Sequence, residues 1–118
     1  MTTTEDIRSW AGALPEVAEV SHFRFGVPVF KVRGRTFLGM GKEETTAVFC
    51  ISERAANVAA AGDAATYEAL RRRDATKSFL GLQVQLGNIS PARAHALVEE
   101  AWREQAPKRL IAEHDRAG

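Results

Sequence analysis

The apolar positions of the chain first recur with the spacing of a helix and then with that of a strand. Over residues 4–14 they fall at i, i+3, i+4 and i+7, which predicts an amphipathic helix capped by the hydroxyl of Thr4. These positions are Ile7, Trp10, Ala11 and Leu14. After this helix the period falls to two, because Phe23 and Phe25 alternate with Arg24, and this alternation predicts a strand with one apolar face.

The segment PVFKVRGRTF has the pattern of a β-hairpin. Gly34 at its centre can supply the positive φ that a two-residue turn requires. A turn of even length keeps Phe30 and Phe37 on the same face of the sheet. Lys31 and Arg33 alternate with the apolar positions, so they are expected to point away from that face together.

Two further strands are predicted after the hairpin turn, TFLGMG and AVFCIS, with the polar segment KEETT between them. AVFCIS is apolar on both sides, which is typical of a strand in the centre of a sheet. Gly39 and Gly41 thin the preceding strand. Glycines in a strand indicate a bulge or a closely approaching neighbour.

Two more helices are predicted to begin at serine residues. Ser52 can cap ERAANVAAA, which Gly62 ends, and the many alanines predict a helix that lies close to the sheet. Ser90 followed by Pro91 is a strong start for a later helix, whose apolar stripe should cover the sheet. The stripe consists of Ala94, Leu97, Val98, Ala101 and Trp102. Pro107 is expected to break or kink the chain after it.

The region before this helix is less regular. Tyr67 and Leu70 are spaced i, i+3, which predicts one or two helical turns, and Arg71, Arg72 and Arg73 follow where the periodicity stops. The next segment, FLGLQVQL, alternates apolar residues with glutamines, so it is predicted to be a strand with one polar face. We expect this strand to lie at an edge of the sheet.

Composition indicates one folded domain. The chain has 118 residues, of which 45% are apolar and 26% charged, values that are ordinary for a globular domain of this length. We predict a single domain over residues 1–112 and a frayed C-terminus over 113–118. The single cysteine, Cys50, cannot form an internal disulfide, and no signal peptide or membrane-spanning run is visible, so a cytoplasmic location is expected.

The sequence offers no recognisable catalytic constellation. The three histidines lie far apart, no pair has metal-ligand spacing, and GMGKEETT lacks the glycine and the hydroxyl that a phosphate loop needs. His22 is interpreted as a hydrogen-bonded residue at the start of a strand, and Cys50 as a small apolar side chain. We therefore expect no enzymatic activity, no metal and no cofactor.

The basic residues are unevenly distributed although the net charge is only +1. No acid lies between His22 and Lys42, a stretch that contains several cations, and a second basic cluster follows residue 70. Such clusters can bind phosphate groups, and the alternative is that they are solvated loops. The candidate nucleic-acid contacts are Lys31, Arg33, Arg35, Arg71, Arg72, Arg73 and Lys77.

Three segments, ALPEV, PVFKVRGRTF and AWREQAPKRL, resemble in order and spacing the MmcQ/YjbR family of small bacterial proteins. The resemblance implies an α+β domain with one antiparallel sheet and helices packed on it, similar to secretion-chaperone-like and frataxin-like folds. It also implies weak, electrostatic, non-enzymatic binding of double-stranded DNA by two basic wings, which match residues 31–36 and 71–77 here. The late strand departs from the family, because SFLGLQVQL stands where many relatives carry a tryptophan.

Two other roles follow from the folds that the family resembles. Iron delivery would need a ridge of carboxylates, and the first helix offers only Glu5 and Asp6, so we set this role aside. A protein or peptide interaction module, acting as a homodimer or with another partner, is the alternative to DNA binding, because the polar-faced late strand could accept a partner strand.

Overall fold

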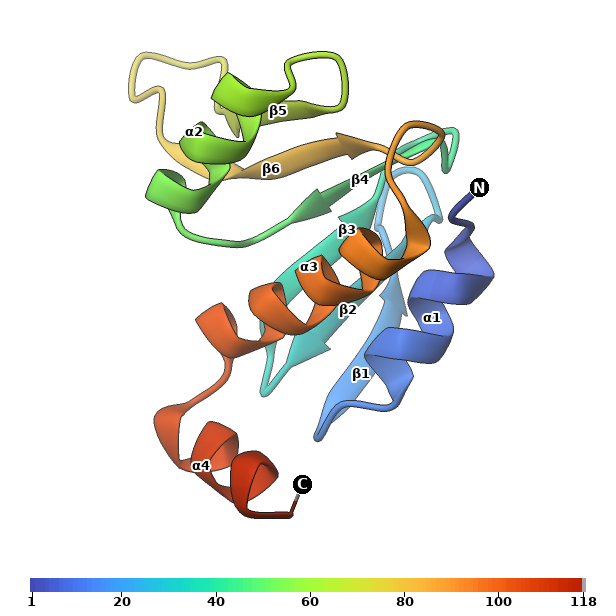
Figure 1. The fold of residues 1–118 in the computed structure, drawn as a ribbon, viewed down its shortest axis with the longest axis vertical. Helices are drawn as coiled ribbons and strands as arrows, with labels where there is room; N and C mark the ends of the chain where they lie inside the picture. The colour runs from blue at the N-terminus through green and yellow to red at the C-terminus, as the bar shows by residue number, and fades with distance from the viewer. Residues whose placement is uncertain (118) are drawn as a thin grey trace.

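The computed structural model describes residues 1–117, which form one antiparallel six-stranded sheet with helices packed on one face (Figure 1). The order of strands is β1-β2-β3-β4-β6-β5. This architecture confirms the predicted α+β class. The elements along the chain are α1 (Thr4–Gly12), β1 (Val17–Ser21), β2 (Pro28–Val32), β3 (Arg35–Met40), β4 (Thr46–Phe49), α2 (Glu53–Gly62), β5 (Tyr67–Arg71), β6 (Phe79–Gln85), α3 (Pro91–Gln105) and α4 (Lys108–Ala117).

The first helix begins one residue earlier than predicted. Its cap is Thr3 and not Thr4, because the Thr3 hydroxyl accepts a hydrogen bond from the backbone amide of Asp6, and the Asp6 carboxylate accepts one from the amide of Thr3. This reciprocal pair satisfies two amide donors that a helix start otherwise leaves free. Ile7 and Ala11 are buried, as the helical spacing predicted.

The hairpin between β2 and β3 is confirmed. Arg33 and Gly34 both have positive φ, 51° and 82°, as a tight two-residue turn with the twist of the strands requires. Phe30 pairs with Leu38, but the pairing then shifts, so that Phe37 is the additional residue of a β-bulge. Both Phe37 and Leu38 are consequently buried in the core.

The strand that contains Gly39 has a bulge and a close neighbour, the two features that the glycines predicted, although the bulge lies at Phe37 and not at a glycine. In addition to the bulge, β3 ends against a close neighbour, because a Cβ atom on Gly41 would lie 3.3 Å from the backbone oxygen of Thr46. The Gly41 amide donates to that same oxygen at 2.8 Å, which closes the turn into β4. As predicted, β4 lies in the centre of the sheet, between β3 and β6.

The prediction of a strand around Phe23 and Phe25 is wrong. The strand β1 ends at Ser21, and residues 22–27 form a turn in which Gly26 has a φ of 71° and its amide donates to the carbonyl of His22. The alternation of phenylalanine and arginine therefore reflects exposed positions in a turn and not the two faces of a sheet.

The helical turns predicted at Tyr67 and Leu70 are also wrong, because Tyr67–Arg71 is the strand β5. Its real period is two, since Tyr67 and Ala69 pack on the core while Glu68 is exposed. The added strand pairs with β6 and lies outside it. The segment FLGLQVQL is therefore an inner strand and not the predicted edge.

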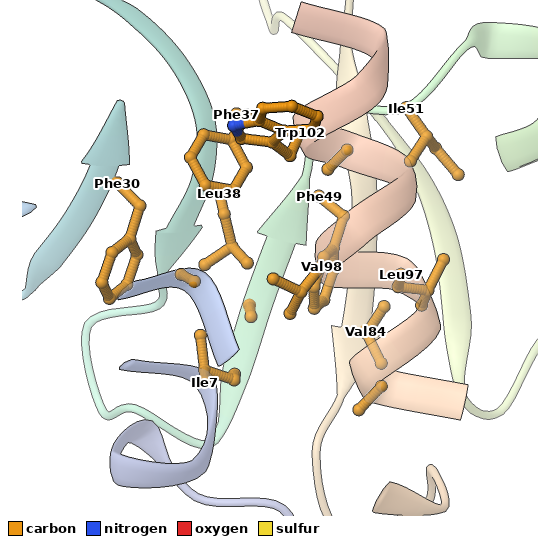
Figure 2. Packing of buried hydrophobic residues seen from close by; sticks show 14 of the residues in the cluster. Ile7, Phe30, Phe37, Leu38, Phe49, Ile51, Val84, Leu97, Val98 and Trp102 are labelled. Carbon is orange, nitrogen blue, oxygen red and sulfur yellow. The ribbon is translucent and has the colours of Figure 1, made fainter. Parts of the chain in front are cut away.

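The core lies between the sheet and the stripe of α3, all five of whose predicted residues are buried. Figure 2 shows Val98 and Trp102 of this helix among the buried side chains of the strands. The indole of Trp102 is fully buried, and its Nε1 donates to the backbone oxygen of Pro15 at 3.1 Å. A buried indole N–H requires a hydrogen-bond partner. The Pro15 oxygen is that partner, and the bond connects α3 to the segment between α1 and β1.

Pro107 separates α3 from α4, as the sequence predicted. Residues 113–117, which we expected to be frayed, belong to α4, whereas Gly118 lies outside the described residues. Leu110 is buried in the common core. The Nη2 atom of Arg103 donates to Asp115 Oδ1 at 2.6 Å, which connects α4 to α3.

Candidate nucleic-acid interface

The two faces of the sheet differ in what covers them. One row of paired residues, Phe30, Leu38, Phe49, Leu82 and Ala69, faces the core formed with the helices. The adjacent row faces the opposite side and consists of Val20, Val29, Gly39, Val48, Gln83 and Glu68. Because side chains alternate between the faces of a strand, this second row defines an open face of the sheet.

Three connected hollows cross this open face, and we call them together the sheet groove. The first is lined by Val20, Ser21, His22, Phe23, Val29, Lys31 and Thr36. The second shares His22, Val29 and Thr36 with it and continues along Gly39, Met40, Val48, Cys50, Leu70 and Leu80. The third shares Leu70 and Leu80 with the second and is completed by Arg71, Arg72, Arg73 and Asp74.

The central section of the groove has an apolar floor. Val29 on β2 and Val48 on β4 supply aliphatic side chains. Gly39 on β3 pairs with both residues and has no side chain, which keeps the floor low. The volume of this section is about 390 Å³, which falls in the range of roughly 300–1,000 Å³ that small-molecule sites occupy. Planar or aliphatic groups could therefore be buried there.

One end of the groove carries exposed aromatic rings. Both Phe23 and Phe25 stack on the imidazole of His22, each with 4.9 Å between ring centroids. The His22 Nδ1 atom accepts hydrogen bonds from the backbone amides of Arg24 (3.1 Å) and Phe25 (3.2 Å), so the imidazole organises the turn. The interpretation of His22 as a hydrogen-bonded residue is thus confirmed, although it follows a strand instead of starting one.

Cations accompany these rings. The guanidinium of Arg24 lies 5.6 Å from the centre of the Phe23 ring, and the ammonium of Lys42, from the β3–β4 turn, lies 5.7 Å from that of Phe25. Attraction between a cation and an aromatic face is worth roughly 0.5–1 kcal/mol at exposed sites. The arrangement places positive charge beside exposed rings without a carboxylate among the residues that line this end.

The other end of the groove is the loop between β5 and β6. Arg71 is held in place, because its guanidinium donates to the carboxylate of Glu53 on α2 and to the backbone oxygen of Lys77. Arg72, Arg73 and Lys77 are exposed. Asp74 is the acid among the lining residues, and it accepts hydrogen bonds from Thr76 within the loop.

The three basic residues predicted on the hairpin do not form one patch. Lys31 pairs with Thr36 and lines the groove, whereas Arg35 pairs with the buried Val32 and therefore projects on the side of the sheet that carries the helices. Arg33 stands at the turn, where its Nη2 donates to Glu16 Oε2 at 3.0 Å. Only Lys31 among them lies on the groove.

The two predicted wings lie at the same end of the sheet but are well separated. All neighbouring strands are antiparallel, so the β2–β3 turn and the β5–β6 loop leave the sheet in the same direction. The strand β4 and the twist of the sheet lie between the two hairpins. Figure 1 shows the loop at the upper left and the turn well below it.

The pair of Arg33 and Glu16 gives a prediction for the pH dependence. Hydrogen bonds from the guanidinium lower the pKa of Glu16 below its ordinary value of 4.5. The carboxylate therefore stabilises the fold fully above pH 4.5, and this contribution is lost as the pH falls through the lowered pKa. We expect an NMR titration to find the lowered pKa, and the substitution Arg33→Ala to return it towards 4.5. An unchanged pKa in that variant would show that the pair is absent in solution.

Comparison with known proteins tests the assignment of this chain to a family. The YjbR family model matches residues 12–104, which is most of the chain. The chain belongs to the YjbR family. No curated protein matches it.

Among solved structures, this YjbR-family protein is similar to the Deinococcus radiodurans protein DR2400, whose domain is described as DUF419. The two share 18% sequence identity with a TM-score of 0.71, over 86% of this chain and 77% of that one. At this identity the likeness shows the fold alone, and it agrees with the resemblance on which the sequence prediction rested.

Other candidate chemistry of the YjbR-family chain is limited. Burial raises the pKa of the Cys50 thiol, which keeps it protonated and unreactive near neutral pH. No cluster of three or more potential metal-ligating side chains occurs within residues 1–117. Over the same range, none of the helices combines the length and apolar character needed to cross a membrane.

Sequence reasoning identified the basic end of the groove and missed its aromatic end. Phe23 and Phe25 were assigned to a strand, so neither they nor the neighbouring Arg24 and Lys42 were candidates. The available signal was the segment HFRFG, in which two phenylalanines flank an arginine and a glycine follows directly. Glycine favours a turn, and connecting segments run over the surface, so aromatic residues within a turn are expected to be exposed.

Proposed function

We propose that this YjbR-family protein is a non-catalytic, cytoplasmic protein that binds nucleic acid weakly and mainly by electrostatic attraction. The β5–β6 loop carries the proposal, because Arg72, Arg73 and Lys77 are exposed there with Asp74 as the acid among the lining residues. Guanidinium groups match the geometry of phosphate oxygens, and each phosphate that is neutralised releases counterions. Lys31 on the open face could extend the contact.

The ion pairs explain why the binding should be weak. Arg33 and Arg71 are engaged with Glu16 and Glu53, so a phosphate would have to compete with a carboxylate for each of them. The net charge of +1 adds little attraction at long range. The affinity should therefore depend on the few free cations of the loop, and it should fall steeply with salt.

The test is the anisotropy of a labelled oligonucleotide at salt concentrations between about 50 and 200 mM. The variant R72A/R73A/K77A should bind about tenfold more weakly at low salt, and the slope of log affinity against log salt should be smaller by about two to three, because three phosphate contacts are removed. Circular dichroism would check that the exposed substitutions leave the fold intact.

A matched control changes the same number and type of charges elsewhere. Arg54, Arg93 and Lys108 are exposed on the helices. The variant R54A/R93A/K108A has the same net charge as the loop variant, so it should lose less than about twofold if the loop is the contact site. Equal losses in both variants would mean that only total charge matters. The absence of binding by any oligonucleotide at low salt would contradict the proposed function.

A further inference from the structure

We propose that the sheet groove binds a single-stranded segment of nucleic acid, whose bases pack on Phe23, Phe25 and the apolar floor while its phosphates meet the cations at the two ends. This inference rests on the proposed function and names the form of nucleic acid that the site would take.

The exposed rings are the first observation. Phe23 is 88% and Phe25 is 49% exposed, although both rings are fixed by stacking on His22. Rings that are ordered but uncovered offer a stacking surface at little cost in conformational entropy. Stacking of a base on an aromatic side chain is the contact that proteins binding single strands use repeatedly, and it tolerates any base sequence.

The floor of the groove is the second observation. Between its two ends the lining consists mainly of aliphatic and small side chains, with Val29, Val48 and Leu80 among them. A duplex would present phosphates and sugars to this floor, because its bases are stacked inside the helix. Only an unpaired strand can turn the apolar faces of its bases onto the floor, and burying them there is favourable.

The charges at the two ends are the third observation. Arg24 and Lys42 stand over the aromatic rings, while Arg72 and Arg73 stand at the far end. By contrast, the hollow along the outer side of α3 mixes two arginines with three glutamates. The two ends of the groove therefore offer cations to a polyanion, and the lining of its central section contains no Asp, Glu, Lys or Arg, which suits the bases between the phosphates.

The length of the groove sets the size of the segment. It crosses from the β1–β2 turn to the β5–β6 loop, and six strands span five spacings, a width of about 24 Å at about 4.8 Å each. The groove is longer than this width, because the antiparallel order places these two loops at opposite ends of the strands. Single β-modules that bind unpaired strands cover at least about four nucleotides. The affinity of a segment that reaches both ends should depend on residues at either end.

The experiment compares an oligothymidylate of about 12 nucleotides with a duplex of the same length, at equal low salt. The wild type should bind the single strand more tightly than the duplex. The variant F23A/F25A should lose about tenfold for the single strand and little for the duplex, because stacking is available only to unpaired bases. The variant F23L/F25L keeps apolar area but removes the rings, so it should lose nearly as much.

A control substitution addresses exposed apolar area in general. Val58 is 69% exposed on α2, far from the aromatic end of the groove, and V58A should leave the affinity unchanged. Competition with polyglutamate at the same charge concentration should displace the single strand poorly, because an acidic polypeptide supplies the charges without the bases.

The outcomes separate this inference from the proposed function. If neither form of nucleic acid binds, the proposed function fails and the inference fails with it. If duplex and single strand bind equally and F23A/F25A has no effect, the inference is overturned while the proposed function stands. Effective competition by polyglutamate, or a dimer in light scattering whose formation F23A/F25A abolishes, would assign the groove to an acidic peptide or to a second copy and would also overturn it.

Discussion

The substitution Trp102→Ala is expected to lower the free energy of unfolding by about 3–5 kcal/mol, the usual cost of truncating a large buried aromatic side chain. Trp102 is fully buried between α3 and the sheet, where it contributes to the core shown in Figure 2. Its removal would leave a cavity and would also leave the backbone oxygen of Pro15 without its donor. Since domains are stable by only about 5–15 kcal/mol, much of the protein would be close to unfolding.

Urea denaturation followed by circular dichroism would measure this effect. The variant W102F keeps one six-membered ring, but it loses the hydrogen bond to Pro15 and leaves a small cavity. Its loss should be about 1–2 kcal/mol, roughly the cost of one buried unsatisfied acceptor plus that cavity. A change below about 1 kcal/mol in W102A would show that α3 does not pack on the sheet as described.

The substitution Gly81→Ala is expected to destabilise the protein by about 2–3 kcal/mol, although it adds only one methyl group. A Cβ atom at this position would lie 2.8 Å from both the backbone oxygen of Phe49 and a methyl group of Val48. The backbone oxygen belongs to the central strand β4 and cannot move without disturbing its ladder. The strain would therefore fall on the pairing of β4 and β6.

Gly39 provides the matched control for this prediction. It also lies in an inner strand, but its added Cβ would make an ordinary contact, 3.8 Å from a methyl group of Val29. Gly39→Ala should therefore be tolerated within about 0.5 kcal/mol. Thermal denaturation of both variants would measure the difference, and equal midpoints would contradict the close approach at Gly81.

Elements whose cause is local could be predicted from the sequence. The turn at Gly34 and the serine caps at Ser52 and Ser90 depend on residues within a few positions, and the structure has each of them. The stripe of α3 was equally readable, because a strong helical period over fifteen residues has no competing interpretation. Local signals of this kind need no knowledge of the rest of the fold.

Elements that depend on distant partners could not be predicted in the same way. Tyr67–Arg71 is short and contains residues that favour either a helix or a strand, and its identity is decided by pairing with β6 and by the cover of α2. The error propagated, because without β5 the strand β6 was placed at the edge. The predicted cap of the first helix was one residue too late. Thr3 and Thr4 both have a hydroxyl that can cap a helix, and the carboxylate of Asp6 favours Thr3 by bonding to its backbone amide.

The candidate site follows the same division. A run of three arginines is visible in the sequence, but the partners that neutralise one of them are not, because Glu53 precedes Arg71 by eighteen positions and belongs to another element. The sheet groove is the product of the strand order, which brings the turn after β1 and the loop after β5 onto one surface. No local pattern contains this information.

The strand order also has a mechanical consequence. The aromatic turn and the basic loop belong to the two outermost hairpins, and the inner strands β3 and β4 separate them. Edge hairpins are the parts of a sheet that open most readily. A molecule bound along the whole groove would contact both edge hairpins and stabilise them at the same time. Its binding would therefore slow hydrogen exchange at the amides of β1 and of β5 together, although these two strands are not neighbours in the sheet.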